Sequence, residues 1–194
     1  MQDVILRQSP ADQQHYCATG VWPDETFADV LRARTAAHPD REAVTDGKAR
    51  LTYRQLEDAI IRVADLLARS GIRPGDIVAV QLPNWIEFIP AYFAIERIGA
   101  IGVPVSIEFR AREVDYVLRT TGARGIITCA EYKKFDHQAM VHALRKDLPE
   151  LAFVGVVRGQ PTGDAVALDP VISASGRPEG FAEVGTDPNA MMRM

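Results

Sequence analysis

The chain has 194 residues, of which 47% are hydrophobic and 25% are charged, and its formal net charge is −4. This composition is typical of a soluble globular domain and argues against intrinsic disorder. The 22 Lys and Arg residues are scattered along the chain, so we expect neither a nucleic-acid partner nor a membrane surface. The sequence shows no signal-peptide pattern and no apolar run long enough to span a membrane.

The two cysteines, Cys17 and Cys129, are far apart in the sequence and lack the spacing of metal ligands. We therefore predict free thiols and a cytoplasmic location, where thiols stay reduced. Cys129 follows an apolar run, which favours a small buried side chain.

The chain divides into three parts by its patterns. Residues 1–23 are polar and predict an irregular leader, residues 24–157 predict an α/β unit, and residues 158–194 predict an irregular excursion. At the start of the α/β unit, Thr26 and Asp29 have the spacing of a helix cap. His38-Pro39 ends that helix, because the residue before proline disfavours the helical region.

A hairpin and a long helix are predicted next. Asp46-Gly47 is a turn dipeptide between two short strand-like runs. Thr52 and Gln55 then form a capping box, and apolar residues recur at helical spacing until Gly71 ends the helix.

The outer face of this helix carries charges four residues apart. Asp58 precedes Arg62, and Asp65 precedes Arg69, at the spacing of ion pairs within one helix. We therefore predict two such pairs.

From residue 77 onward, apolar runs alternate with helical patterns. The runs at 77–82, 101–105, 125–128 and 153–157 are continuous, as in strands that are buried on both faces. The alternation predicts an α/β fold with a layered parallel sheet, right-handed crossovers and helices on both faces. Within 158–194 we expect one short helix starting at Asp169-Pro170, and the apolar run at 190–192 predicts the start of a truncated strand.

Three residues follow the first parallel strand, at the edge where α/β sheets bind ligands. Asn84 and Glu87 have the spacing of a helix cap, and we interpret both as capping residues. Trp85 lies on an apolar helical face, which favours a core position over the wall of a pocket.

Other candidate residues have simpler interpretations. His137 and His142 are five residues apart on a helix, so they do not share a face and make a poor metal pair. Asp76 precedes its strand, at the opposite end from the ligand-binding edge, and is interpreted as a turn residue.

The segment between residues 51 and 104 resembles the N-terminal part of the acyl-adenylate-forming enzymes: acyl-CoA synthetases, aryl-acid ligases, adenylation domains and luciferases. The resemblance rests on five short motifs: Leu51-Thr52-Tyr53 with Leu56, Pro74-Gly75-Asp76, Leu82-Pro83-Asn84, Gly99-Ala100 and Val103-Pro104. It implies the N-terminal portion of the large domain of an acetyl-CoA-synthetase-like fold. It also implies a reaction in which a carboxylic acid and ATP form an acyl-AMP, whose acyl group passes to a thiol such as coenzyme A.

The parts that hold ATP in this family are missing from the chain. There, a Ser/Thr/Gly-rich phosphate loop with a lysine follows a segment like 186–189, and the acyl pocket, adenine site and catalytic lysine come later. We therefore assign no catalytic, cofactor-binding or metal residue and expect an inactive N-terminal fragment. ATP, Mg²⁺ and CoA are expected to bind only the full-length enzyme. A sheet cut from its neighbouring half leaves apolar surface exposed, so we also expect the fragment to self-associate.

Finer resemblances narrow the substrate. The stretch 15–22 is similar to the opening of short- and medium-chain fatty acyl-CoA ligases, cyclohexanecarboxylate-CoA ligases and dihydroxybenzoate-AMP ligases. The stretches 81–85 and 103–106 resemble the first two groups more than the third. The implied substrate is a short- or medium-chain fatty acid or an alicyclic acid, and Arg110 or Arg112 is a candidate to meet a CoA phosphate. Two alternatives remain open: an aryl-acid or amino-acid adenylating enzyme, and a stand-alone α/β binding module without catalysis.

Overall fold

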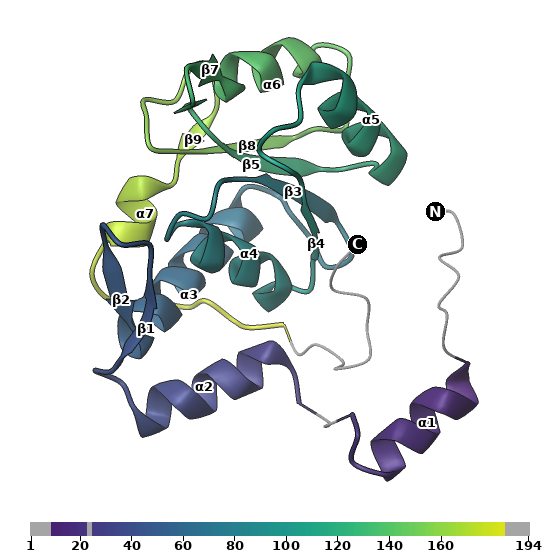
Figure 1. Cartoon of the computed structure of the whole chain (residues 1–194), viewed down its shortest axis with the longest axis vertical. Coiled ribbons are helices and arrows are strands. Elements are labelled where there is room, and N and C mark those ends of the chain that lie inside the picture. The colour runs from purple at the N-terminus through teal and green to yellow at the C-terminus, as the bar shows by residue number, and fades with distance from the viewer. Residues whose placement is uncertain (1–8, 23–24, 185–194) are drawn as a thin grey trace.

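The computed structural model describes residues 9–22 and 25–184. At its centre is a five-stranded sheet in the order β4-β3-β5-β8-β9, and all four pairings are parallel (Figure 1). The strands are β3 (Ile77–Gln81), β4 (Ile101–Pro104), β5 (Gly125–Cys129), β8 (Phe153–Val157) and β9 (Val166–Ala167). The predicted α/β fold with a layered parallel sheet is confirmed.

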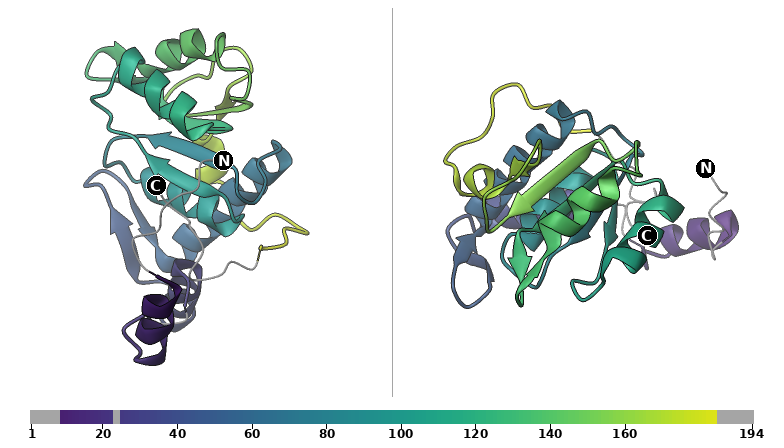
Figure 2. Two further views of the ribbon diagram at one scale, coloured as in Figure 1. Left: turned by 90° about the vertical axis from the view of Figure 1, so that its right-hand side faces the viewer. Right: turned by 90° about the horizontal axis from the view of Figure 1, so that it is seen from above.

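Helices cover both faces of the sheet, and each face has its own core. In Figure 1, α5 and α6 lie above the sheet and α3 and α4 lie below it; Figure 2 shows the same layers from two other sides. These helices are α3 (Tyr53–Arg69), α4 (Phe88–Arg97), α5 (Ala111–Thr121) and α6 (His137–Arg145). Alternate strand residues point to opposite layers: Val78 and Val80 pack with α3 and α4, whereas Ala79 packs with α5 and α6.

The winding of the sheet creates a ligand-binding position. The chain runs from β3 to β4 through α4 on one face, then crosses back over the other face through α5 to reach β5 on the far side of β3. The loops that leave β3 and β5 therefore diverge to opposite faces. A crevice opens at such a switch point, outside the carboxyl ends of the strands.

The elements before the sheet form as their caps predict. Thr26 and Asp29 make a reciprocal capping box at the start of α2 (Phe27–Ala37), and Thr52 and Gln55 make another at the start of α3. The hairpin of β1 (Glu42–Thr45) and β2 (Arg50–Thr52) lies between them. Since α3 buries a complete apolar face, it anchors both α2 and the hairpin to the sheet layer.

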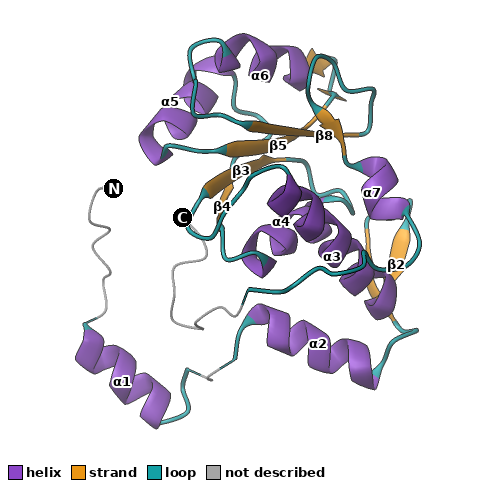
Figure 3. Cartoon of the chain, turned by 180° about the vertical axis from the view of Figure 1, so that it is seen from behind, coloured by secondary structure: helices purple, strands orange, loops and turns teal. Residues whose placement is uncertain are grey.

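Two expectations about irregular segments are corrected. The leader contains the helix α1 (Pro10–Ala18), because Ser9 and Asp12 form a capping box and Pro10 favours the first helical turn; α1 lies apart from the body of the molecule (Figure 3). The excursion contributes β9 as the fifth strand, and the expected short helix is α7 (Asp169–Ser173). The strand predicted at 190–192 lies outside the described residues.

The predicted pair between Asp58 and Arg62 is also wrong. Arg62 donates to the carbonyl oxygens of Val171, Ile172 and Gly176, at 2.6–2.8 Å, and Asp58 accepts from the Nε of Arg177 at 2.6 Å. Sequence spacing cannot foresee partners that lie more than a hundred residues away. These contacts fasten the excursion along α3.

The second predicted pair is confirmed, because the Nε of Arg69 lies 2.8 Å from an Oδ of Asp65. Asp76 caps a turn, as expected, by accepting from the N–H of Arg73 at 2.8 Å. No helix within the described residues is long and apolar enough to cross a membrane.

Candidate functional site

A cleft of about 570 Å³ opens at the carboxyl edge of the sheet, where the winding places it. Residues 82–85 after β3 and residues 104–107 after β4 form two of its sides, and Phe88 and Tyr132 complete the lining. Tyr132 comes from the hairpin of β6 (Glu131–Tyr132) and β7 (Phe135–Asp136), which follows β5. The lining contains aromatic and aliphatic side chains with two neutral polar ones, Asn84 and Ser106, so the cleft suits an uncharged group.

Aromatic contacts shape the cleft wall. The Trp85 ring meets the Tyr132 ring edge to face, with centroids 5.9 Å apart. Trp85 is half-buried and packs against the core, as expected, but it precedes α4 instead of lying on a helical face, and it also lines the cleft. The interpretation of Trp85 as a core residue alone is therefore incomplete.

Behind Trp85 stands the Arg158 cluster, which we define as Asp46, Trp85, Glu87, Arg158 and Asp169. The guanidinium carbon of Arg158 lies 4.1 Å from the centroid of the Trp85 ring. Its Nε donates to Glu87 Oε1 at 2.9 Å, and an Nη donates to Asp46 Oδ2 at 2.7 Å. Its backbone N–H donates to Asp169 Oδ2 at 2.7 Å. Four separate segments of the chain meet at this one arginine.

The capping role predicted for Asn84 and Glu87 is wrong. Helix α4 begins only at Phe88, and Glu87 makes no side-chain cap bond. The carboxylate of Glu87 accepts from the guanidinium of Arg158 instead, a bond in which both partners are charged, whereas a helix N–H is neutral. Its other oxygen, Oε2, is buried and has no hydrogen-bond partner. Asn84 is exposed on the lip of the cleft.

The two aspartates of the cluster titrate differently. Three backbone N–H groups and Arg158 hold the pKa of Asp46 below its usual range, and the bond from Ala49 is the largest cause. Burial raises the pKa of Asp169, against the opposing effect of the Arg158 N–H. The cluster therefore contains a firmly ionised acid beside the cleft wall and a desolvated acid behind it.

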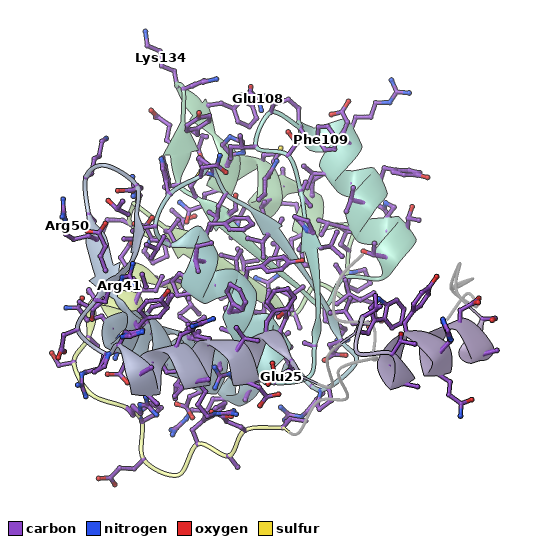
Figure 4. All side chains as sticks on the ribbon, turned by 60° about the horizontal axis from the view of Figure 1, so that its bottom comes forward. Glu25, Arg41, Arg50, Glu108, Phe109 and Lys134 are labelled. Carbon is purple, nitrogen blue, oxygen red and sulfur yellow. The ribbon has the colours of Figure 1, made fainter. Side chains whose placement is uncertain are left out.

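The β6–β7 hairpin closes with a two-residue turn in which both residues have positive φ, the backbone geometry that matches the twist of the paired strands. Lys133 and Lys134 both have positive φ angles, 48° and 64°, a conformation that costs a residue other than glycine about 1–3 kcal/mol. Lys133 Nζ donates to Glu108 Oε1 at 2.9 Å, which links the hairpin to the loop after β4. Figure 4 shows Lys134 at the tip, pointing away from the body, with Glu108 and Phe109 on the neighbouring loop.

Of the two arginines expected to meet a phosphate, Arg110 lies beside this hairpin. Arg110 donates to the carbonyl oxygens of Ile107 and Phe109 at 3.1 Å, and its guanidinium lies 4.2 Å from the centroid of the Phe135 ring. Arg110 therefore holds its own loop in shape, while Arg112 is exposed at the start of α5.

The histidines and the buried cysteine lie in separate environments. His137 is fully buried, neither ring nitrogen has a hydrogen-bond partner, and its ring meets Phe135 edge to face at 4.8 Å. Burial, followed by the charge of Arg110, lowers the pKa of His137. Cys129 is fully buried, as predicted, and burial raises the pKa of its thiol to about 11. Across residues 9–22 and 25–184, no three His, Cys, Asp or Glu side chains gather where they could hold a metal ion.

The residues at the carboxyl edge do not fit a nucleoside triphosphate. Binding one requires a loop of several backbone N–H donors with a lysine and an acid for Mg²⁺. In the described part of the chain, the loop after β3 contains Pro83, the loop after β4 is held by Arg110, and both lysines of the hairpin tip point outward or pair with Glu108. We derive no step of ATP chemistry from these residues.

Comparison with known proteins identifies the family. A family model described as AMP-binding enzyme matches residues 31–190. The chain belongs to this family. Among its relatives, 2,3-dihydroxybenzoate-AMP ligase of Bacillus subtilis is 32% identical over 92% of the chain. Salicyl-AMP ligase of Mycobacterium tuberculosis is 37% identical over 78% of the chain, and medium-chain fatty-acid–CoA ligase of Escherichia coli is 32% identical over 81%.

The fold agrees with this membership. The apo structure of Mycobacterium smegmatis MbtA superposes with a TM-score of 0.83, at 32% identity, over 95% of this chain and 34% of that protein. A long-chain-fatty-acid CoA ligase homologue from Rhodopseudomonas palustris gives 0.68, at 29% identity, over 80% of this chain. The chain spans about a third of the length of these relatives: 32%, 28% and 28% of the three ligases named above.

Sequence reasoning missed the central residue of the site. The sequence predicts Arg158 as the first residue of an irregular excursion, although an arginine directly after a buried strand lies at the ligand-binding edge by position alone. Tyr132 carries no signal in the sequence, because the two-residue strands of its hairpin leave no periodic pattern.

Proposed function

We propose that the protein carrying this chain is an AMP-forming ligase, which activates a carboxylic acid with ATP and passes the acyl group to a thiol. The observation that carries this proposal is the family match over residues 31–190, supported by the superposition on MbtA at a TM-score of 0.83. The cleft at the switch point adds a physical argument, because α/β sheets bind small molecules at that position.

Within such an enzyme, this chain serves as a scaffold. It builds one layered sheet and the cleft at its carboxyl edge, and it supplies no cradle for the triphosphate within the residues described. We therefore expect the isolated 194-residue chain to be inactive and to bind ATP, Mg²⁺ and CoA only weakly. A chain that bound a nucleotide tightly by itself would instead be a stand-alone binding module.

Two substrate classes have support. The short stretches at 81–85 and 103–106 favour a short- or medium-chain fatty or alicyclic acid, and the relative from Escherichia coli acts on medium-chain fatty acids by its name. Aryl acids are favoured by the extent of the matches, because the relatives named for dihydroxybenzoate and salicylate match at 32% and 37% identity and the former covers 92% of the chain.

The thiol that accepts the acyl group also has two candidates, CoA and a carrier protein. A CoA ligase releases acyl-CoA, whereas a loading enzyme transfers the acyl group to a carrier protein. Arg112, exposed in the first turn of α5, remains the candidate for a CoA phosphate. A cytoplasmic location also remains a prediction.

Substrate panels test the proposal on the complete gene product. ATP–pyrophosphate exchange is measured with octanoate, cyclohexanecarboxylate, salicylate, 2,3-dihydroxybenzoate and amino acids. Exchange with a fatty or alicyclic acid supports the first substrate class, and exchange with the hydroxybenzoates supports the second. Strong exchange with an amino acid alone rejects both. The 194-residue chain is the matched control, and isothermal calorimetry with ATP should detect no tight binding to it.

A further inference from the structure

The Arg158 cluster combines features that a structural ion pair does not need. Arg158 is not glycine, yet its φ angle is +51°, in the left-handed region. The backbone is held there by the bond from its N–H to Asp169, at the start of α7. Strained residues of this kind concentrate at functional sites, where the surrounding structure over-determines them.

The strained backbone aims the side chain at the cleft wall. Leaving β8, the guanidinium reaches back over the face of the Trp85 indole, 4.1 Å from its centroid. From this position its Nε and one Nη donate to two different carboxylates, Glu87 at 2.9 Å and Asp46 at 2.7 Å. A planar fork can stack on a ring and donate to two acceptors simultaneously, which the ammonium group of lysine cannot do.

The two carboxylates are themselves fixed. Asp46 accepts from the backbone N–H groups of Lys48 and Ala49 in the β1–β2 turn, both at 2.9 Å, and from that of Ile86 at 3.3 Å. Glu87 precedes α4 directly. The position of the guanidinium is therefore set by the hairpin on one side and by the start of α4 on the other.

We propose that Arg158 is a positioning residue that holds the Trp85 indole as the wall of the cleft and so fixes the shape of the group the cleft admits. Trp85 also contacts Tyr132, with the two rings edge to face. Loosening Arg158 frees the indole to rotate and changes the cleft width. The identity of the ligand whose binding depends on the cleft width rests on the proposed function.

The order of Trp85 can be measured without any substrate. The chain has two tryptophans, so the variant Trp22→Phe leaves Trp85 as the only reporter. In this background, labelled with 5-fluorotryptophan, the parent chain is expected to give one sharp ¹⁹F resonance and weak quenching by acrylamide. Arg158→Lys keeps the positive charge and removes the planar fork. It is expected to broaden or split the resonance and to increase acrylamide quenching.

Arg145→Lys is the matched control. The Arg145 side chain is 23% exposed, against 25% for Arg158. Like Arg158, it forms an ion pair, in this case with Asp164, and its Nε also donates to the carbonyl oxygen of Leu151. It belongs to α6, on the opposite layer from Trp85, so its replacement should leave the ¹⁹F resonance unchanged.

A second variant guards against a general loss of folding. Asp46→Asn removes one of the charged partners of Arg158 while it keeps an oxygen for the turn N–H groups, and it is expected to broaden the Trp85 resonance less than Arg158→Lys does. Circular dichroism confirms that each variant is folded. A sharp, unshifted resonance in folded Arg158→Lys overturns the proposal. Because this readout needs no activity, failure of the positioning role is distinguishable from failure of the proposed function.

Discussion

Arg97 and Glu57 face each other across the interface of α4 and α3, with Nη1–Oε1 and Nη2–Oε2 separations of 3.0 and 3.2 Å. Both side chains are only 3% exposed. Arg97 also donates to Glu183 at 2.6 Å, and Glu183 accepts from Arg32 of α2 at the same distance. This chain of ion pairs joins α2, α3, α4 and Glu183 of the excursion.

Breaking the buried pair from one side is expected to destabilise the fold strongly. Arg97→Met leaves the Glu57 carboxylate buried without a cation, which costs about 3–5 kcal/mol. The free energy of unfolding is measured by urea denaturation. The double variant Glu57→Leu with Arg97→Met removes both charges and should recover most of that loss.

An exposed pair provides the comparison. Arg119 pairs with Asp115 on α5, with side chains 50% and 30% exposed, so Arg119→Met should cost at most about 1 kcal/mol. Equal losses for Arg97→Met and Arg119→Met would show that burial of the first pair has no energetic consequence.

A close approach at the carboxyl edge predicts a compensating double variant. A Cβ atom at Gly159 would overlap the Cβ of Ala130, and neither atom belongs to a flexible side chain. Gly159→Ala must therefore push apart the ends of β5 and β8, at an expected cost of about 1–3 kcal/mol. Adding Ala130→Gly removes the clash and should restore part of the stability in thermal denaturation. Additive losses in the double variant would contradict this geometry.

His137 should make stability depend on pH. Its pKa is lowered in the folded chain, so the unfolded chain binds a proton first as the pH falls. Stability is therefore complete above the unfolded pKa of about 6.5 and decreases below it by at most about 1.4 kcal/mol per pH unit. Urea denaturation between pH 7.5 and pH 5.5 measures this slope.

His137→Leu should reduce that slope, because a buried apolar side chain replaces two nitrogens that have no partner. His142→Gln is the control and should retain it. An unchanged slope in His137→Leu would assign the pH dependence to other titratable groups. Asp136 and Glu108, whose charges act on the His137 ring, are the first candidates.

The layers of the fold could be predicted from the sequence, because they follow from periodic patterns. The strand at Phe153–Val157 was predicted with its observed bounds, and the caps at Thr26 and Thr52 were found from residue spacing alone. The site was harder to predict, since its decisive contacts join residues that are distant in the sequence. Glu87 has the spacing of a cap, yet it binds Arg158, 71 residues away. No local sequence pattern indicates that Glu87 pairs with Arg158 instead of capping the helix.

Self-association of the 194-residue chain remains a prediction, and the exposed apolar side chains of α2 indicate which surface would associate. Helix α2 has no buried residue, and it leaves Phe27 52% and Val30 41% exposed. Apolar surface of this kind promotes association, so sedimentation velocity should show a dimer or larger species of the 194-residue chain. Val30→Glu should shift the distribution to monomer. Tyr116→Glu on α5, where the tyrosine is 69% exposed, should not, and a monomer at high concentration in the parent chain would contradict the prediction.

The most direct test of the central claim is acid-dependent ATP–pyrophosphate exchange by the complete gene product. The account predicts incorporation of labelled pyrophosphate into ATP that requires a carboxylic acid and is absent from the isolated 194-residue chain. Failure of every fatty, alicyclic, aryl and amino acid to support exchange by a folded, complete protein would contradict it.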